Sequence, residues 1–286
     1  MSLSPRLRQL SLVIGMSAVS PLLMAADPTP FTVKAMTYNI QVAGTQPPHA
    51  WALRLPLMVR LLQRETPDVI GTQEGRYEQV RDLATALPDY DWIGVGRDGG
   101  SEGEFMAVFY RRARFEPVAF DHFWLSDTPA VVGSATWGNQ YRRMVTWVRF
   151  RERATNREFE VWNTHFDHEV EPARVKSAAL IRQRLAATDR PLLLLGDFNC
   201  VAGRSVAYTE LTVGAGLTDA WNVARRRGPE DLNTFNGHKG PQRRGERIDW
   251  ILGRAVAAVD ETAILDYAEA GLAPSDHYPV TAQVTF

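Results

Sequence analysis

Polar side chains stand at the ends of several short apolar segments of this chain. Each segment is typical of a strand, and each ends in an acid, an amide or an imidazole. The residues at these ends are Asn39, Glu74, His165, Asp197, Asn199, Asp276 and His277. Asp249 lies instead inside an apolar segment, where a charged group needs a partner. Acids and amides in such number, with no thiol among them, predict an oxygen-rich site for a hard divalent cation.

The stretch PLLLLGDFNC, residues 191–200, indicates how such residues are positioned. Four consecutive leucines are too few for a buried helix and predict a strand covered on both faces. The run stops at Gly196, so Asp197 and Asn199 follow at the carboxyl end of a buried strand, where α/β proteins build their sites. If the chain stays extended, these two side chains project to one side while Phe198 packs inward. The alternative is an Asx-rich turn without function.

The order of the other elements predicts a layered α/β protein. Strands are expected at 31–40, 68–74, 92–95, 105–111, 115–120, 144–150, 159–168, 247–252, 263–267 and 278–286. Helices are expected at 51–62, 77–87, 172–185 and 205–211. Many strands with helices at both ends of this order favour two packed sheets covered outside by helices. No linker or repeat divides the chain, so one domain over residues 27–286 is expected.

Six motifs carry a resemblance to a known family: TYNIQ, GTQE, NTHFDH, LGDFN, RIDWIL and PSDH, in that order. Together they resemble the endonuclease/exonuclease/phosphatase superfamily, over about residues 31–286. The resemblance implies a four-layer α/β/β/α sandwich of two mixed β-sheets, the deoxyribonuclease I-like fold. It also implies a Mg²⁺-dependent phosphoester hydrolase, with Mn²⁺ as the alternative ion and one site between the sheet edges.

The same resemblance implies a role for each motif residue. Asn39 and Glu74 would hold the metal ion, with Asp276 contributing directly or through water. Asp197 would orient and deprotonate the attacking water, and Asn199 would position that water and the phosphate. Independently of any family, phosphoester hydrolysis needs an in-line water, a base, and donors on the phosphoryl oxygens.

Two histidines complete the implied site. His277, paired with Asp249, would contact the phosphoryl oxygens as charge builds. His165 would donate to the leaving oxygen or stabilise the transition state. Glu104 resembles the acid that supports this second histidine in deoxyribonuclease I. An acid beside a histidine fixes the tautomer of the ring and favours the imidazolium form.

The sequence leaves the roles of two pairs of neighbouring residues open. Arg143 resembles a phosphate-contacting arginine of the superfamily, and Arg142 competes with it for the role. Asp167 and His168 are as consistent with an ordinary loop as with a site.

The motifs leave the phosphoester open between monoester and diester. Gln41 and Arg76 stand where apurinic endonucleases carry an acid and a lysine, which disfavours a repair nuclease. Deoxyribonuclease I has cysteine pairs that form disulfides, whereas Cys200 is the only cysteine here. The stretches at 71–100, 124–129 and 163–168 resemble most a bacterial, partly secreted subgroup of the superfamily that includes sugar-phosphate phosphatases. This resemblance favours a small phosphorylated substrate, and a non-catalytic binding module is disfavoured because no motif residue is missing.

A nuclease acting on DNA or RNA is the alternative, and it would need a basic, aromatic groove. Its candidate residues are Arg111, Arg112, Trp137, Tyr141 and Arg142. The 286 residues carry a formal net charge of −1, and loss of a basic N-terminal segment would make the charge more negative, so bulk charge does not favour nucleic acid. The arginines at 225–227, 243, 244 and 247 form either a local positive rim or solvated loops.

Residues 1–26 predict a signal peptide. Arg6 and Arg8 precede an apolar stretch over residues 10–23, and Ala25 and Ala26 follow it. An N-terminal helix packed on the domain is the alternative. We therefore expect a periplasmic or secreted monomer without stable membrane insertion after cleavage. Cys200 cannot form an intramolecular disulfide, and it is expected to be a packed residue rather than a nucleophile.

Overall fold

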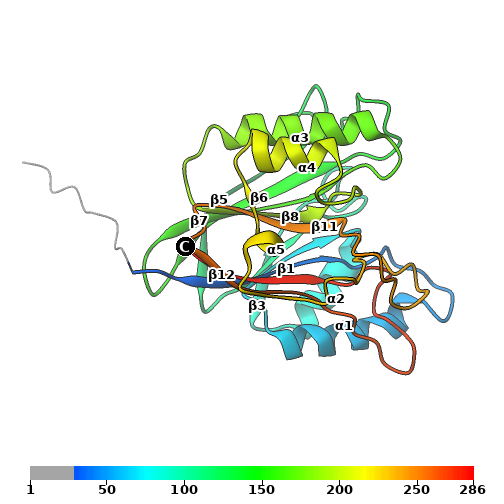
Figure 1. The fold of residues 1–286 in the computed structure, drawn as a ribbon. Helices are drawn as coiled ribbons and strands as arrows, with labels where there is room; N and C mark the ends of the chain where they lie inside the picture. Colours follow the sequence, from blue (N-terminus) through cyan, green and yellow to red (C-terminus); the bar gives the residue numbers. More distant parts are fainter. Residues whose placement is uncertain (1–28) are drawn as a thin grey trace, which may run out of the picture.

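The computed structural model describes residues 29–286. The predicted signal peptide, residues 1–26, lies outside them. Two β-sheets pack face to face and helices cover the outer side of each, so the expected four-layer α/β/β/α sandwich is confirmed (Figure 1). None of the helices within residues 29–286 combines the length and the apolarity that a bilayer span requires.

The first sheet has seven strands in the order β10-β12-β13-β1-β2-β4-β3. These strands are β1 (Thr32–Asn39), β2 (Val69–Gln73), β3 (Tyr90–Ile93), β4 (Val108–Arg111), β10 (Arg226–Gly228), β12 (Ala258–Ile264) and β13 (Val280–Thr285). Its outer face is covered by α1 (Trp51–Glu65) and α2 (Tyr77–Ala86) (Figure 1). Parallel β1 and β2 end in register at Asn39 and Gln73, so Glu74 leaves the sheet next to Asn39.

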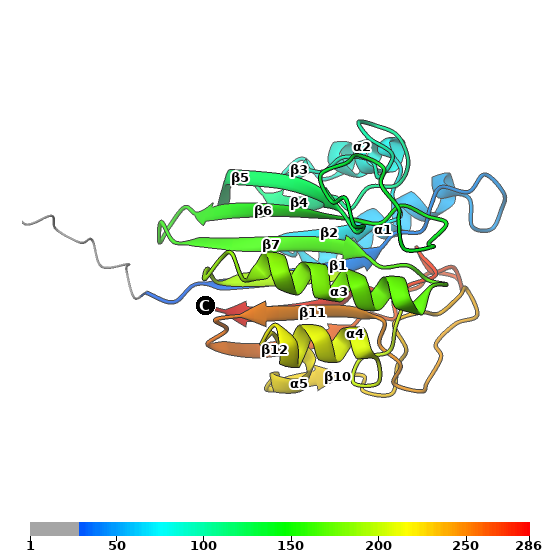
Figure 2. The same cartoon turned by 90° about the horizontal axis from the view of Figure 1, so that it is seen from above.

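The second sheet has six strands in the order β5-β6-β7-β8-β11-β9. These strands are β5 (Phe115–Trp124), β6 (Met144–Glu152), β7 (Glu158–His165), β8 (Leu192–Asp197), β9 (Thr218–Asp219) and β11 (Asp249–Arg254). Its outer helices are α3 (Glu171–Leu185), α4 (Val206–Thr209) and the π-helical turn η1 (Glu210–Gly214), while α5 (Ala220–Val223) lies at the edge of the sandwich. Figure 2 shows α3 running along this face beside β7.

The leucines of β8 pack alternately on the two faces of the second sheet. Leu193 and Leu195 pack in the core between the sheets, and Leu192 and Leu194 pack under α3. All four are fully buried, as expected for a strand covered on both faces. Burying a leucine stabilises the fold by about 1.5–3 kcal/mol, so this strand anchors the residues that follow it.

A polar link crosses the core between the sheets. Asn163 of β7 accepts a hydrogen bond from Gln73 Nε2 at 2.7 Å. Its own Nδ2 donates to the carbonyls of Thr72 and Ala107 at 2.8 and 2.9 Å. A Cβ on Gly71 would lie only 2.7 Å from the Asn163 oxygen, so β7 can approach β2 only because residue 71 is glycine. This link fixes the positions of the strand ends at Glu74 and His165 relative to each other.

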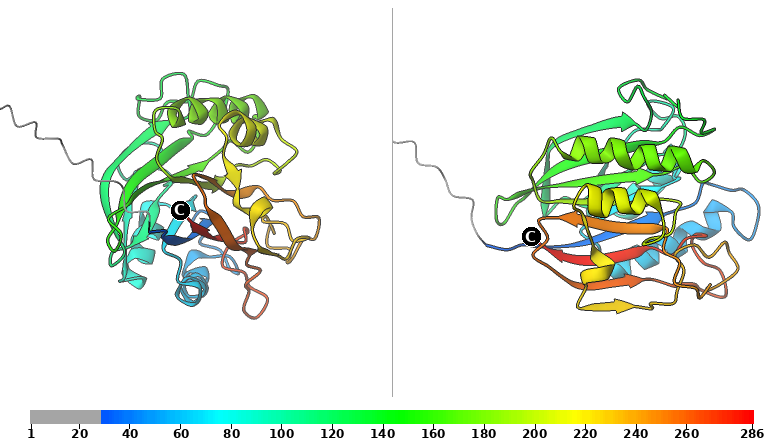
Figure 3. Two further views of the ribbon diagram at one scale, coloured as in Figure 1. Left: turned by 60° about the vertical axis from the view of Figure 1, so that its left-hand side comes forward. Right: turned by 45° about the horizontal axis from the view of Figure 1, so that its top comes forward.

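Several segments differ from the sequence-based expectation. The strand expected at 105–111 begins only at Val108, and the helix expected at 205–211 divides into α4 and η1. The strand expected at 263–267 is β12, which begins at Ala258 and ends at Ile264. Arg226 and Arg227 lie in the short edge strand β10, and each of the three arginines at 225–227 pairs with an acid. They therefore form no free positive rim. The first and last described strands begin and end together, with Thr32 opposite Thr285, at the end of the sandwich marked by the C terminus (Figure 3).

Candidate active site

Three polar side chains form one row across the second sheet. In the parallel pairing of β7 with β8, His165 lies opposite Asp197. In the antiparallel pairing of β8 with β11, Asp249 lies opposite Asp197. Neighbouring strands are about 4.8 Å apart, so this register alone brings the three side chains together. The predicted convergence of these strand ends is therefore present in the structure.

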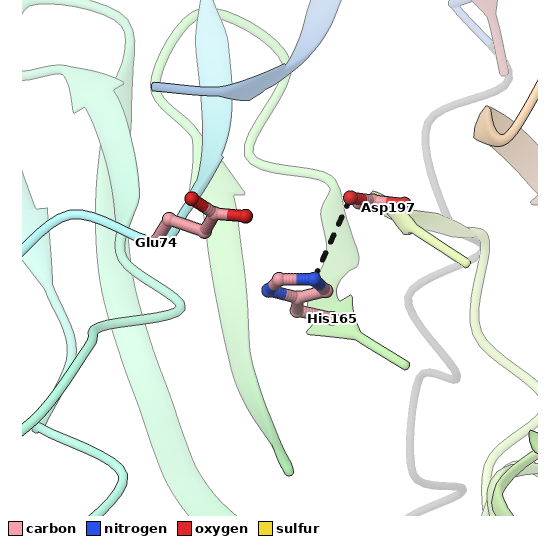
Figure 4. Close-up of side chains that lie close together, drawn as sticks. All are labelled: Glu74, His165 and Asp197. Atoms are coloured by element: carbon pink, nitrogen blue, oxygen red, sulfur yellow. Dashed lines mark ion pairs between the residues drawn. The ribbon is translucent and has the colours of Figure 1, made fainter. Parts of the chain in front are cut away.

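Asn39 connects this row to the first sheet. Its Nδ2 donates to Glu74 Oε1 at 2.9 Å and to Asp197 Oδ2 at 3.0 Å. Its Oδ1 accepts the backbone N–H of Gln41 at 3.0 Å. Because the amide nitrogen rather than the oxygen faces the two acids, this geometry favours an orienting role over the predicted role as a metal ligand. Figure 4 shows the carboxylates of Glu74 and Asp197 on either side of His165.

The chain does not stay extended after Asp197. Asn199 has a φ of 49°, and its N–H donates to Asp197 Oδ1 at 2.9 Å in an Asx turn. Its side chain still lines the same pocket as Asp197, anchored by a hydrogen bond from Nδ2 to the carbonyl of Phe166 at 3.0 Å. Phe198 packs inward as expected and stacks on Trp250 with ring centroids 4.2 Å apart. The functional and the turn interpretations of this stretch are therefore compatible.

His277 and Asp249 form the expected pair. Nδ1 of His277 lies 3.0 Å from Asp249 Oδ2, and Nε2 lies 3.7 Å from Asp197 Oδ2. Burial alone would lower the pKa of His277, but the carboxylates of Asp249 and Asp197 overcome burial and raise it to about 10. Burial and the neighbouring Asp249 also raise the pKa of Asp197. The ring of His277 is therefore an imidazolium at neutral pH.

His165 differs from the prediction in its partner. Nε2 lies 3.5 Å from Asp197 Oδ2, and Nδ1 is buried with no hydrogen-bond partner among the described residues. Glu104 pairs instead with Arg97 at 2.6 Å, so its predicted support of His165 is wrong for this structure. Burial, followed by the cationic Arg143, lowers the pKa of His165 well below its ordinary value. This histidine is neutral.

Arg143 rather than Arg142 lines the pocket. Its side chain is only 4% exposed, and its Nε and Nη1 have no hydrogen-bond partner within residues 29–286. Nη2 donates to His168 Nδ1 at 3.1 Å, and the nearest acid, Asp167, is 4.0 Å from Nε. Arg142 is half exposed and pairs with an acid of the 96–104 loop. A buried guanidinium with two free donors is a site for an anion.

Asp167 and His168 have different roles in the structure. Asp167 is buried, and its Oδ1 accepts the N–H groups of Glu169 and Val170 at 3.0 and 2.7 Å, which shapes the turn into α3. His168 is exposed, lines the pocket and contacts Arg143. The first is therefore structural and the second belongs to the site.

The pocket has a volume of about 370 Å³. It is lined by Glu74, Arg97, Glu104, Tyr141, Arg143, His165, His168, Asp197, Asn199, Phe235, Ile248, Asp276 and His277. Sequence reasoning missed Arg97 and Phe235. Arg97 follows the expected strand at 92–95, so its position at a strand end was a usable signal. No sequence pattern marks Phe235, whose ring packs edge-on against His277 with centroids 5.1 Å apart.

The residues named for a nucleic-acid groove do not gather at this pocket. The register of β2 with β4 pairs Val69 with Tyr110, so Arg111 and Arg112 lie at the end of the sheet opposite to Glu74. Trp137 lines a separate hollow beside α3. Of the five candidates, only Tyr141 lines the pocket. Arg243 and Arg247, expected as rim or loop residues, each pair with an acid.

The donor set fits a divalent cation. Ligand atoms of Glu74, His165 and Asp197 lie within 4.8 Å of one another, as do those of Asp197, Asp249 and His277. The second group is already a hydrogen-bonded set with a charged imidazole, which repels a cation. Burial raises the pKa of Asp276, and the charge of nearby Glu74 raises it further, so a cation between these acids would relieve their repulsion. Carboxylate oxygens are the ligands that Mg²⁺ prefers.

Cys200 is a packed residue, as expected. It is buried in the cluster beneath α3 and has no disulfide partner. Burial raises the pKa of its thiol to about 11, so the thiolate that a nucleophile requires is not formed at neutral pH.

Comparison with known proteins finds similar structures that cover most of this chain. An endonuclease/exonuclease/phosphatase family protein from Bacteroides thetaiotaomicron is 32% identical, with a TM-score of 0.85 over 90% of this chain and 96% of that one. A mannosyl-6-phosphatase of the same organism is also 32% identical, with a TM-score of 0.84 over 89% of this chain and 100% of that one.

A further relative matches a shorter part of the chain. A protein of Acanthamoeba polyphaga mimivirus is 30% identical over 162 residues, which are 53% of this chain and 60% of that protein. The match therefore spans less than two thirds of that relative's length. Residues 36–277 match the model of the Endonuclease/Exonuclease/phosphatase family. The chain belongs to this family of phosphoester hydrolases.

Proposed function

We propose that the protein is a phosphatase for small phosphorylated sugars that depends on Mg²⁺ or Mn²⁺. The observation that carries this proposal is the buried guanidinium of Arg143, whose Nε and Nη1 have no hydrogen-bond partner within the described chain. It shares one pocket with the carboxylates of Glu74 and Asp276. Groups of opposite charge thus face the same space, the arginine suited to a phosphate and the acids to a cation.

The size and surroundings of the pocket support a small substrate. Its 370 Å³ lie at the lower end of the range of ligand pockets, about 300–1,000 Å³. Most of the arginines that could contact an extended polymer are either paired with acids or far from the pocket. Arg142, the arginines at 225–227, Arg243 and Arg247 pair with acids, and Arg111 and Arg112 lie at the far end of the first sheet. The mannosyl-6-phosphatase that resembles this chain supports a sugar phosphate as the substrate class.

The residues of the pocket can divide the reaction between them. Asp197, whose pKa is raised by burial and by Asp249, is suited to accept the proton of the attacking water. The imidazolium of His277 and the donors of Arg143 without hydrogen-bond partners would stabilise the phosphoryl oxygens, where negative charge builds. The neutral ring of His165 carries one N–H for the leaving oxygen. Held by Glu74 and Asp276, the divalent cation would supply Lewis acidity.

The test is hydrolysis of mannose 6-phosphate and of supercoiled plasmid DNA, each with Mg²⁺ and then with EDTA. We expect release of inorganic phosphate that EDTA abolishes, and no nicking of the plasmid. Glu74→Gln should lose both this activity and calorimetric Mg²⁺ binding while it stays folded. Glu78→Gln, an exposed acid on α2, is the matched control and should behave as wild type. Plasmid nicking without sugar-phosphate hydrolysis would establish the nuclease alternative.

We also propose that the chain is exported and that the mature protein begins near Ala26 or Asp27. The order of charged, apolar and small residues over 1–26 supports this proposal. N-terminal sequencing of the protein from a periplasmic extract tests it, and an intact Met1 in that extract would contradict it.

A further inference from the structure

Gln41 links Asp276 to a histidine outside the pocket. Its Nε2 donates to Asp276 Oδ2 at 3.1 Å, and its Oε1 lies 2.8 Å from His238 Nε2. The backbone of Gln41 has a φ of 54° and is held by Arg54 Nη2 and Gln79 Nε2, which both donate to its carbonyl. The side chain is therefore fixed at its base as well as at both ends of its amide.

The direction of this link follows from the donor and acceptor groups. A carboxylate only accepts hydrogen bonds, so the NH₂ of Gln41 must face Asp276. The amide oxygen then faces His238, which must carry its proton on Nε2. The other ring nitrogen, Nδ1, is buried without a partner among residues 29–286, as an unprotonated nitrogen would be. His238, Gln41 and Asp276 thus form a directed chain of two hydrogen bonds.

His238 is itself held in place. Its ring stacks on His49 with centroids 3.6 Å apart and an angle of 21° between the planes. The backbone N–H of His238 donates to Asn236 Oδ1 at 2.8 Å. The N–H groups of Asn236 and Gly237 both donate to the carbonyl of Asp276, at 2.8 and 3.0 Å. One loop therefore holds the backbone of Asp276 directly and its side chain through Gln41.

We infer that Gln41 is a positioning residue for Asp276 and that His238 acts through Gln41, so that this chain sets the affinity of the site for a divalent cation. The inference rests on the proposed function, because it requires Asp276 to hold the cation. Besides Gln41, the only side chain that donates to the carboxylate within the described residues is Ser275, at 3.3 Å from Oδ1. Loss of an outer partner that orients a metal ligand typically weakens metal binding 10- to 100-fold.

The test is calorimetric titration of Mg²⁺, without substrate, into wild type, Gln41→Leu, His238→Phe and the double variant. Leucine keeps most of the glutamine volume without its amide, and phenylalanine keeps a ring on His49 without its N–H. We expect Gln41→Leu to bind Mg²⁺ roughly 10- to 100-fold more weakly. His238→Phe should bind more weakly than wild type but less weakly than Gln41→Leu. The double variant should equal Gln41→Leu, because the side chain of His238 is hydrogen-bonded toward Asp276 through Gln41, while the backbone contacts of residue 238 are kept in both variants.

His122→Phe is the matched control, since this half-buried histidine on β5 contacts Thr146 rather than the site. Melting temperatures in EDTA show whether each variant is folded. If Gln41→Leu does not fold, the Mg²⁺ affinity of His238→Phe alone tests the inference. Wild type that fails to bind Mg²⁺ would overturn the proposed function. Wild type that binds, with folded variants that bind equally well, would overturn only the inference on Gln41. Multiplicative losses in the double variant would show that His238 does not act through Gln41.

Discussion

His165 and His277 are both buried, and their Nε2 atoms lie 3.5 and 3.7 Å from the same oxygen of Asp197. The opposite ring nitrogen distinguishes them. In His277 it meets Asp249, and the pKa of the ring rises; in His165 it has no partner, Arg143 lies nearby, and the pKa falls. A second neighbour, rather than burial or the shared acid, therefore decides which histidine is charged. A site with one charged and one neutral imidazole can both stabilise negative charge and donate to a leaving group.

Removing the acid behind His277 should have the largest effect on this contrast. For Asp249→Asn we expect kcat to fall by about 10²- to 10⁴-fold, because the imidazolium loses the carboxylate that stabilises it. The pKa of His277 should fall as well, measured by NMR titration of the ring. The double variant with His277→Ala should be little worse than either single variant, since the two residues act as one unit. Asp231→Asn, an exposed acid in a surface loop, is the control. Multiplicative losses would contradict the pairing.

Removing the cation beside His165 should have the next largest effect. For Arg143→Ala we expect kcat/KM to fall by about 10²- to 10³-fold, because two donors to the phosphate are lost. The pKa of His165 should rise, since a positive neighbour is removed. Arg142→Ala should change kcat/KM little, because this residue is half exposed and paired with Asp98. Equal losses in both variants would show that the choice between the two arginines is wrong.

His165 ends a strand of the second sheet, whereas Glu74 and His277 adjoin strands of the first sheet, so the contrast between the two histidines depends on how the sheets meet. We expect Gly71→Ala to lower the free energy of unfolding by about 1–3 kcal/mol, because its Cβ overlaps Asn163. In an Asn163→Ala background the same change should cost less, since the overlapping side chain is gone. Urea denaturation of the four proteins measures this coupling. Additive costs would place the strain elsewhere.

The charge difference between the two histidines should also appear in the dependence of stability on pH. The pKa of His277 is about 10 when folded and about 6.5 when unfolded, so the folded state binds the proton more tightly. Its contribution is fully present below pH 6.5 and is lost as the pH rises through 10. Without metal, wild type should have a larger free energy of unfolding than His277→Gln at pH 6, and this difference should disappear as the pH rises to 10. Chemical denaturation of both proteins over this pH range measures the difference. A difference that stays constant over this range would contradict the raised pKa.

The strand-end residues were predictable because they depend on local order. Apolar runs predict strands, and register then brings their ends together, as with His165, Asp197 and Asp249. The contacts of loops were not predictable in this way. The pairing of Glu104 with Arg97, and of Gln41 with His238, depends on how loops fold over the sheet edge, which no periodicity records.

The orientation of single groups was equally beyond the sequence. The motif TYNIQ names Asn39 but does not say whether its nitrogen or its oxygen faces the acids, which is set by Gln41 and Glu74. Arg142 and Arg143 are neighbours with the same side chain. Only the path of the loop into β6 decides that Arg143 is buried and Arg142 exposed.

Glu74 holds a backbone conformation that glycine adopts more easily, with a φ of 65°. A glycine at this position would relieve strain of the kind that is stored at functional sites, at a typical cost of about 1–3 kcal/mol. Selection for thermal resistance alone would therefore tend to discard this side chain, and with it the acid nearest Asn39. In a population of variants evolved without a demand for turnover, position 74 should be among the first of the pocket to drift. If a lineage selected for heat resistance keeps glutamate at position 74, selection for activity must have continued in that lineage.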